Sequence, residues 1–159
     1  MQIYTNKFNI TVYQQIIAQL FDTSKLSSIS VNYLISGQFL LNNIDINSDF
    51  SPVTIQYGRA VENELKEIFL SIDSSKTWML GKMQGSLEKF KFGMTTLPQC
   101  NSREFALLQI ELVNRFNVPS DLKINLIDSI REIRNSAGHS GQTMNKQEAL
   151  DYILLVNQF

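Results

Sequence analysis

The residues best suited to chemistry lie in one short segment, Arg134-Asn135-Ser136-Ala137-Gly138-His139-Ser140, which contains the only histidine of the chain. Histidine can take up or release a proton near neutral pH, and a guanidinium can hold a phosphate through two parallel hydrogen bonds. Together they suit RNA cleavage by the adjacent 2′-hydroxyl. A base removes the hydroxyl proton while the arginine stabilises charge on the phosphate oxygens, and no metal is needed.

The five-residue spacing between Arg134 and His139 allows two interpretations. In an unbroken helix the two side chains would point about 140° apart, since each residue turns the helix by about 100°. If Gly138 ends the helix, the chain can fold back and direct both side chains at one anion. Alternatively, the arginine is favoured in a last helical turn by the helix dipole, and the histidine is a solvated loop residue.

The counts of histidine and cysteine limit what one chain can assemble. With one cysteine, Cys100, an intramolecular disulfide is excluded. With one histidine, zinc sites built from clustered His and Cys ligands are also excluded, and we expect no cofactor. Cys100 has no evident catalytic partner and is interpreted as an inert, half-buried thiol. A single histidine cannot easily be acid and base on opposite sides of one phosphate, so we predict a homodimer.

The elements that must position these residues are predicted to be helices around a single core. The chain has 159 residues, of which 43% are apolar, enough for one domain. Apolar residues recur three and four positions apart, which favours helices over strands. The predicted helices cover approximately residues 12–21, 29–41, 53–69, 77–90, 105–116, 122–137 and 145–159. With no convincing strand pair, we expect an all-α bundle.

Several residues are predicted to begin, separate or pack these helices. Ser27 and Ser120 are candidate N-caps. The polar segment 42–49 reads as a loop and sets a weak domain boundary. Gly81 and Gly85, four positions apart, are predicted to permit close packing of another helix.

The charge balance requires any contact with nucleic acid to be local. Fourteen Lys and Arg residues against fifteen Asp and Glu residues leave a net charge of −1, which excludes a globally basic surface. Residues 76–91 form a local candidate beside Trp78 and Phe92, although such runs are usually a solvated helix face. The lysines of this stretch are Lys76, Lys82, Lys89 and Lys91.

Nothing in the sequence predicts a membrane partner. The apolar stretches are far shorter than the roughly 18 residues needed to span a bilayer. The first ten residues lack the basic and apolar regions of a signal peptide. We therefore expect a cytoplasmic protein.

The segment RNSAGH, residues 134–139, resembles the R-x4-6-H signature of HEPN domains, in the form where Asn directly follows the Arg. Its place near the end of an all-α chain is also similar to that family. The predicted helix containing YGRAVENEL, residues 57–65, resembles the family's earlier helix, where a polar or acidic residue often faces the active centre. The resemblance covers residues 52–159. It implies a HEPN-like antiparallel helical bundle of about five to six helices over residues 51–159, after an N-terminal helical extension over residues 1–50.

Many HEPN domains are metal-independent endoribonucleases whose dimers form a composite site and leave cyclic phosphate and 5′-hydroxyl ends. Many serve prokaryotic toxin–antitoxin, CRISPR-associated or abortive-infection systems. The resemblance thus implies an RNA substrate, a homodimer and an antitoxin or defence-complex partner. It assigns phosphate binding to Arg134, acid–base chemistry to His139 and orientation of the site to Asn135. Glu62 is implied in a supporting role, with a surface ion pair to Lys66, four residues on, as the alternative.

One position departs from the family. In HEPN toxins paired with minimal nucleotidyltransferases, a tyrosine two positions after the histidine is modified by the antitoxin, whereas this chain has Gly141. We do not expect that mode of control. Two other classes stay open: a catalytically inactive HEPN-type module for dimerisation or nucleotide binding, and a helical adaptor in which RNSAGH is coincidental. The presence of both Arg134 and His139 favours activity.

Overall fold

The computed structural model describes residues 9–75, 77–91, 106–107, 110, 121–139 and 141–159. Over these residues the chain forms six α-helices, a short 3-10 helix at Thr23–Lys25, and no strand. The α-helices are α1 (Ile10–Leu20), α2 (Ser28–Asn43), α3 (Ser51–Ile72), α4 (Leu80–Lys91), α6 (Asp121–Gly138) and α7 (Lys146–Gln158). The predicted all-α class is confirmed.

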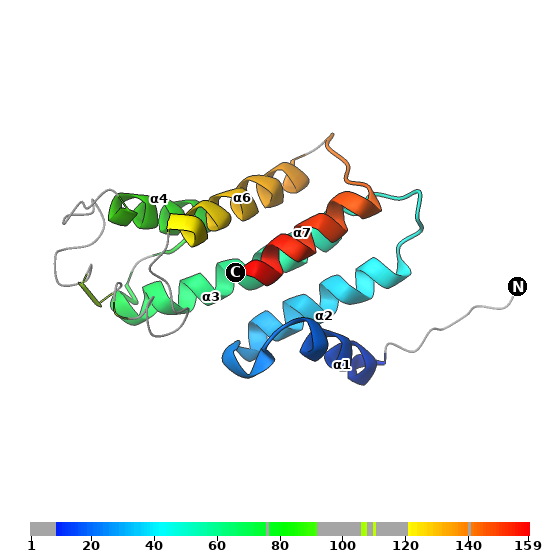
Figure 1. The fold of residues 1–159 in the computed structure, drawn as a ribbon, viewed down its shortest axis with the longest axis horizontal. Helices are drawn as coiled ribbons and strands as arrows, with labels where there is room; N and C mark the ends of the chain where they lie inside the picture. The colour runs from blue at the N-terminus through cyan, green and yellow to red at the C-terminus, as the bar shows by residue number, and fades with distance from the viewer. Residues whose placement is uncertain (1–8, 76, 92–105, 108–109, 111–120, 140) are drawn as a thin grey trace, which may run out of the picture.

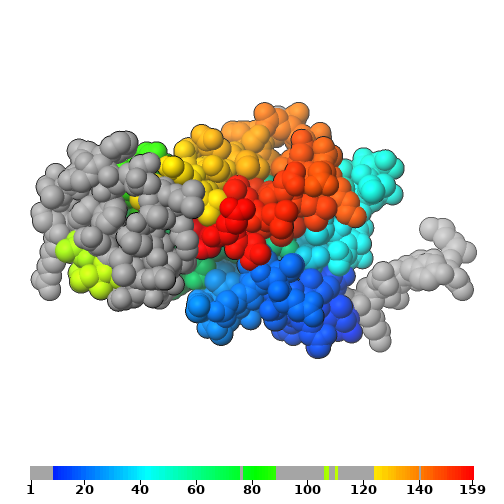
Figure 2. Space-filling model, viewed as in Figure 1, coloured from blue at the N-terminus to red at the C-terminus, as the bar shows by residue number. Residues whose placement is uncertain are grey.

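Helix α3 is the central element of the bundle (Figure 1). It packs against α2, α4, α6 and α7, while α1 packs on α2. Helices α2, α3, α6 and α7, taken in that order, run in alternating directions (Figure 1). On the face shown in Figure 2, α7 lies between α6 on one side and the N-terminal helices on the other. Helix α3 thus positions its buried residues against four neighbouring helices.

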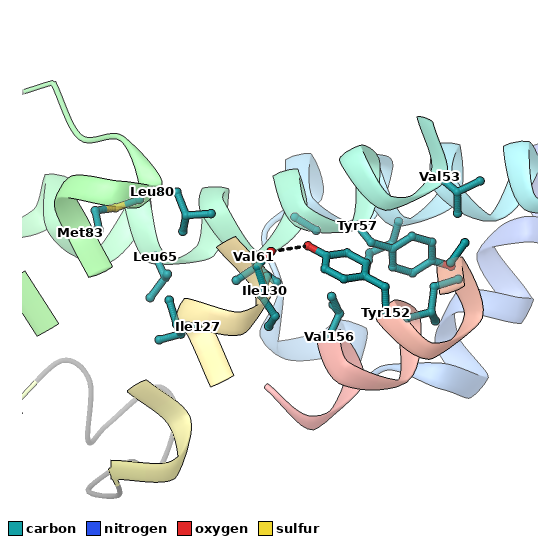
Figure 3. Packing of buried hydrophobic residues seen from close by; sticks show 14 of the residues in the cluster. Val53, Tyr57, Val61, Leu65, Leu80, Met83, Ile127, Ile130, Tyr152 and Val156 are labelled. Atoms are coloured by element: carbon teal, nitrogen blue, oxygen red, sulfur yellow. Dashed lines mark hydrogen bonds between the residues drawn. The ribbon is translucent and has the colours of Figure 1, made fainter. Parts of the chain in front are cut away.

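The core forms where apolar faces of four helices meet α3. Val53, Tyr57, Val61 and Leu65 recur along α3 at helical spacing and are at most 3% exposed. Figure 3 shows them facing residues of α4, α6 and α7. Those partners include Leu80, Met83, Ile127, Ile130, Tyr152 and Val156. Helices α1 and α2 add Ile17, Leu34, Ile35 and Leu41 to the same cluster. The predicted boundary near residue 50 stays a prediction.

The ends of the helices follow local signals. Ser27 is the N-cap of α2, as predicted, and its side chain accepts a hydrogen bond from the Ser30 N–H at 3.2 Å. Proline stands in the first turn of α3, where a missing N–H costs nothing. Asn145 and Glu148 form a reciprocal capping box at the start of α7.

Two local predictions are wrong. Helix α4 begins at Leu80 rather than Thr77, and Trp78, which precedes it, is buried against Phe69 with ring centroids 4.7 Å apart. A methyl group placed at Gly81 or Gly85 would meet no described atom within 4 Å, so these glycines do not serve close packing against any helix that the structure describes.

Other predictions lie outside the described residues. These are the loop at 93–101, the cap at Ser120, the thiol of Cys100, Lys76, Phe92 and most of the helix at 105–116. In the part of the chain that the structure describes, no helix is long and apolar enough to cross a membrane.

Candidate functional site

Arg134 projects from the last part of α6 toward α3 and meets a carboxylate there. Its Nη2 donates to Glu62 Oε2 at 2.8 Å, and its Nη1 donates to Asn135 Oδ1 at 3.0 Å. The side chains of Arg134 and Glu62 are 29% and 23% exposed, so water reaches the pair. The fold thus brings together three of the four predicted site residues, from positions 72 residues apart in the chain.

Glu62 also contacts a third helix. Its Oε1 accepts a hydrogen bond from the N–H of Leu80, the first residue of α4, at 3.1 Å. The first N–H groups of a helix have no partner inside the helix, and a carboxylate there is favoured by the helix dipole. One carboxylate therefore connects α3, α4 and α6.

The alternative interpretation of Glu62, a surface ion pair with Lys66, does not hold. Both carboxylate oxygens are engaged by Arg134 and Leu80. Lys66 is exposed and forms no ion pair with any residue that the structure describes.

Gly58 allows Arg134 to reach this position. A methyl group at Gly58 would lie 2.5 Å from Arg134 Cγ and 2.7 Å from the Tyr152 hydroxyl oxygen, too close for either contact. The Tyr152 hydroxyl in turn donates to the Ile130 carbonyl of α6 at 3.2 Å (Figure 3). Burial raises the pKa of the Tyr152 phenol above its ordinary value, and the Arg134 charge acts in the opposite direction. Tyr152 thus remains a protonated donor.

Sequence reasoning missed the roles of Gly58 and Tyr152. The available signal was an isolated glycine one turn before Glu62, inside an otherwise regular helical pattern, which indicates a close approach or a cost to helix stability. For Tyr152 the sequence offered only its place on an apolar helix face.

Arg134 retains donor capacity beyond the two bonds to Glu62 and Asn135. Its Nε is buried and donates to no residue that the structure describes. Arginine binds carboxylates and phosphates most tightly when two of its N–H groups act in parallel on one anion. The bond to Glu62 uses one oxygen and one nitrogen, so this pair does not use the bidentate mode.

His139 is the first residue after α6 and is exposed. Its backbone N–H donates to the Ser136 carbonyl at 3.1 Å, and its carbonyl accepts from the Gln142 N–H at 3.4 Å. The helix therefore ends at Gly138, as predicted. No hydrogen bond joins the His139 side chain to Arg134, Asn135 or Glu62, or to another described residue.

The loop that carries His139 is held at its far end. The Met144 N–H donates to Asp49 Oδ1 at 3.0 Å, and the Met144 carbonyl accepts from the Phe50 N–H at 2.8 Å. Ser136 and Gln142 are hydrogen-bonded across the same loop, and Gly141 has a φ of 92°, which favours glycine. These contacts fix where the chain re-enters the bundle after His139.

Trp78, which lies in the basic stretch at 76–91, is not available to stack on a base, and RNA contact by the rest of the stretch stays a prediction. Trp78 is 3% exposed, and its indole N–H donates to the Asp73 carbonyl at 3.1 Å, so its ring is not available to a base. Lys82 is exposed. The side chains of Lys89 and Lys91 lie outside the described residues.

Comparisons with known proteins identify no relative: no family model, curated protein or solved structure matches this chain. In the described ranges, no group of three or more His, Cys, Asp or Glu side chains could hold a metal ion.

Proposed function

We propose that this protein is a metal-independent endoribonuclease that cleaves RNA by attack of the 2′-hydroxyl, at a site shared by two copies of the chain. One observation carries the proposal. The Arg134 guanidinium lies at a water-accessible seam, oriented by Glu62 and Asn135, on the helix that His139 directly follows. The RNSAGH motif supplies the reaction class, because it resembles the HEPN signature.

The reaction follows from the properties of the two side chains. The His139 imidazole takes the proton of the 2′-hydroxyl, and the freed oxygen attacks the neighbouring phosphorus. Arg134 stabilises the negative charge that develops on the non-bridging phosphate oxygens. The bond to the 5′-oxygen breaks, and that oxygen receives a proton. The products are a 2′,3′-cyclic phosphate and a 5′-hydroxyl end.

The second proton transfer is the reason for a homodimer. The leaving oxygen lies on the side of the phosphorus opposite the attacking oxygen, and one imidazole cannot easily serve both sides. A two-fold axis would place a second His139 at the leaving oxygen. Following the resemblance, we assign this activity to a prokaryotic defence or toxin–antitoxin system in the cytoplasm, with an antitoxin or defence-complex protein as its partner.

The test compares three variants on a mixed RNA substrate in the presence of EDTA. We expect His139→Ala and Arg134→Ala to lower the cleavage rate by about 100-fold or more, since each removes a group needed in the transition state. Arg131→Ala is the matched control, because Arg131 lies one turn earlier on α6 and pairs with Asp128 at 2.8 Å. It should cleave at the wild-type rate. Cleavage that persists in His139→Ala, or that never occurs in wild type, contradicts the proposal.

Sedimentation or light scattering tests the shared site. A protein that is strictly monomeric while it cleaves RNA would overturn the homodimer and leave the single-site chemistry to be explained.

A second candidate is a catalytically inactive HEPN-type module for dimerisation or nucleotide binding within a larger assembly. The pairing of Arg134 with Glu62 favours it, because an arginine neutralised by the carboxylate that connects α3, α4 and α6 already has a structural role. RNA that stays intact with wild type as well as with both variants, while all three proteins remain dimers, would support this candidate over the nuclease.

A further inference from the structure

We propose that the Glu62 carboxylate competes with a phosphate of the RNA for the Arg134 guanidinium. When the phosphate binds Arg134, the carboxylate moves from Arg134 to Lys66. The inference rests on the proposed function, because it concerns regulation of the same site. It assigns Glu62 a role that opposes substrate binding and links that binding to helix α4.

The first support is the set of donors around the Glu62 carboxylate. Arg134 Nη2 donates to one oxygen at 2.8 Å, and the Leu80 N–H at the start of α4 donates to the other at 3.1 Å. A guanidinium is also a donor that proteins use for phosphate. The carboxylate thus uses the same Arg134 donor that a phosphate would need.

The second support is that the ion pair between Glu62 and Arg134 is of a kind that another anion can replace. The two side chains are 23% and 29% exposed, and solvent-exposed ion pairs contribute little to stability. The contact is a single hydrogen bond rather than a bidentate pair. Glu64, two residues on, is the contrast: it is 4% exposed and fixed to the Ser27 N–H, out of reach of solvent anions.

The third support is the position of Lys66, which can form an ion pair with the displaced Glu62 carboxylate. Lys66 lies four residues after Glu62 on the same side of α3, is exposed, and pairs with no described carboxylate. A glutamate followed four residues later by a lysine is the favourable order for an ion pair on a helix. Arg59, three residues before Glu62, is also exposed. Its Cζ lies over the Tyr33 ring, 5.9 Å from the ring centroid.

Displacement of Glu62 has a structural consequence. When its carboxylate leaves Arg134 for Lys66, the Leu80 N–H loses its acceptor, and the first turn of α4 is no longer fastened to α3. Binding of a phosphate at Arg134 would therefore loosen the first turn of α4.

The main test measures binding of a 2′-O-methyl oligonucleotide, which cannot be cleaved through a 2′-hydroxyl, by fluorescence anisotropy. Glu62→Gln removes the competing charge, and we expect the Kd to fall about tenfold, within the usual range of couplings between sites. Asp128→Asn is the matched control. It also raises the net charge by one, and it removes the closer of the two carboxylates that pair with an arginine of α6, Arg131. We expect it to change the Kd by less than about twofold.

Several outcomes overturn the inference. Unchanged or weaker binding by Glu62→Gln means that Glu62 does not compete. An equal gain in Asp128→Asn assigns the effect to overall charge. The gain must also vanish in Glu62→Gln combined with Arg134→Ala, because the freed guanidinium is its source.

Lys66→Gln tests the exchange in a chain that keeps Glu62. We expect weaker oligonucleotide binding than wild type, and no further loss when Lys66→Gln is added to Glu62→Gln, since Lys66 then has no carboxylate to receive. Lys146→Gln, the loss of an exposed lysine at the start of α7, is the matched control. A loss that persists in the double variant would assign Lys66 a direct contact with RNA and overturn the exchange.

Hydrogen exchange at the Leu80 amide is an independent readout. We expect oligonucleotide binding to speed exchange at this amide in wild type, and unchanged exchange would overturn the link to α4. The nuclease proposal fails separately. If wild type never cleaves RNA but Glu62→Gln still binds more tightly, the competition stands; if wild type cleaves and Glu62→Gln binds no better, only the competition fails.

Discussion

Two polar seams join α3 to its neighbours, and they differ in how far water reaches them. The α2–α3 seam contains two sets of hydrogen-bonded side chains. One is the pair of Gln38 and Tyr57, and the other is a group where the start of α2 meets α3. That group consists of Ser27, Ser30, Asn63 and Glu64. The Asn63 side-chain amide donates to the Ser27 and Ser30 hydroxyl oxygens at 2.9 and 3.1 Å, and the Tyr57 hydroxyl donates to Gln38 Oε1 at 2.9 Å.

The α3–α6 seam is formed by Glu62, Arg134 and Asn135, and here both charged groups remain accessible to solvent. Arg134 also keeps a buried Nε that donates to no described residue. Buried polar groups that are fully hydrogen-bonded hold a core in one arrangement, whereas partly exposed ion pairs exchange readily. The two seams thus differ in what a ligand could reach, because solvent contacts both charged groups of the α3–α6 seam, where we propose the site.

The largest effect on stability is expected from Gly58→Ala. Alanine favours a helix over glycine by about 1 kcal/mol, but the added methyl group would force Arg134 and Tyr152 apart. Overpacking of this kind costs about 1–3 kcal/mol, so we expect a net loss in the free energy of unfolding and in RNA cleavage. Gly81→Ala is the matched control, because it adds the same methyl group to a helix position where no described atom lies within 4 Å. Equal melting temperatures for the two variants would refute the close approach.

The α2–α3 seam is tested by Tyr57→Phe. Removal of the hydroxyl leaves buried Gln38 Oε1 without its donor, and we expect a loss of about 1–2 kcal/mol in chemical denaturation. Oligonucleotide binding should not change, since the bond between Tyr57 and Gln38 is buried. A change in binding at unchanged stability would reverse the roles assigned to the two seams.

A third contact, between Met144 and the segment before α3, combines features of both seams. Its carboxylate, Asp49, is exposed like the charged groups of the α3–α6 seam, but it accepts several hydrogen bonds. Asp49 Oδ1 accepts from Ser51 Oγ, Ser51 N–H and Met144 N–H at 2.6, 2.9 and 3.0 Å. Partial desolvation acts to raise the pKa of the Asp49 carboxyl. Hydrogen bonds from Ser51 Oγ and from the Met144 and Ser51 N–H groups outweigh it and hold the pKa below its ordinary value of 3.8.

Asp49→Ala should cost about 1 kcal/mol near pH 7. A lowered pKa in the folded state means that ionised Asp49 stabilises the fold above its unfolded-state pKa, and that this contribution disappears as the pH falls through the folded-state pKa. The difference between wild type and Asp49→Ala in urea unfolding should therefore shrink below about pH 4. A difference that grows in acid would contradict the assigned direction.

The smallest effect is expected from Asp128→Asn. Asp128 and Arg131 form an ion pair on the surface of α6, with side chains 34% and 27% exposed. Such pairs contribute less than about 1 kcal/mol, and we expect a change in melting temperature near the limit of calorimetry. A large change would show that exposure does not separate weak from strong pairs in this protein.

Local signals predicted most of the helices. Ser27, Pro52 and the apolar pattern of α3 act within a few residues, and the structure places helix starts where they indicate. The capping box of Asn145 and Glu148 was also readable from its spacing.

Partner choice could not be predicted in the same way. Glu62 and Arg134 are 72 residues apart, and local spacing favoured Lys66 as the partner of Glu62. The choice depends on how α6 packs across α3, which in turn depends on the missing side chain at Gly58. Burial of the Trp78 ring likewise depends on how helices pack, so the lysines near Trp78 in the sequence could not indicate it.

The anchoring of Met144 has a consequence for the entropy of substrate binding. Positions 139–143 are the only ones between the last residue of α6 and Met144, whose N–H and carbonyl both bond to the segment before α3. A short segment fixed at both ends has already lost much of its conformational freedom during folding. Under the proposed function, little further ordering of the His139 backbone is then required for RNA binding, so we expect the RNA strand, rather than this loop, to bear the entropic cost of reaching the reactive geometry.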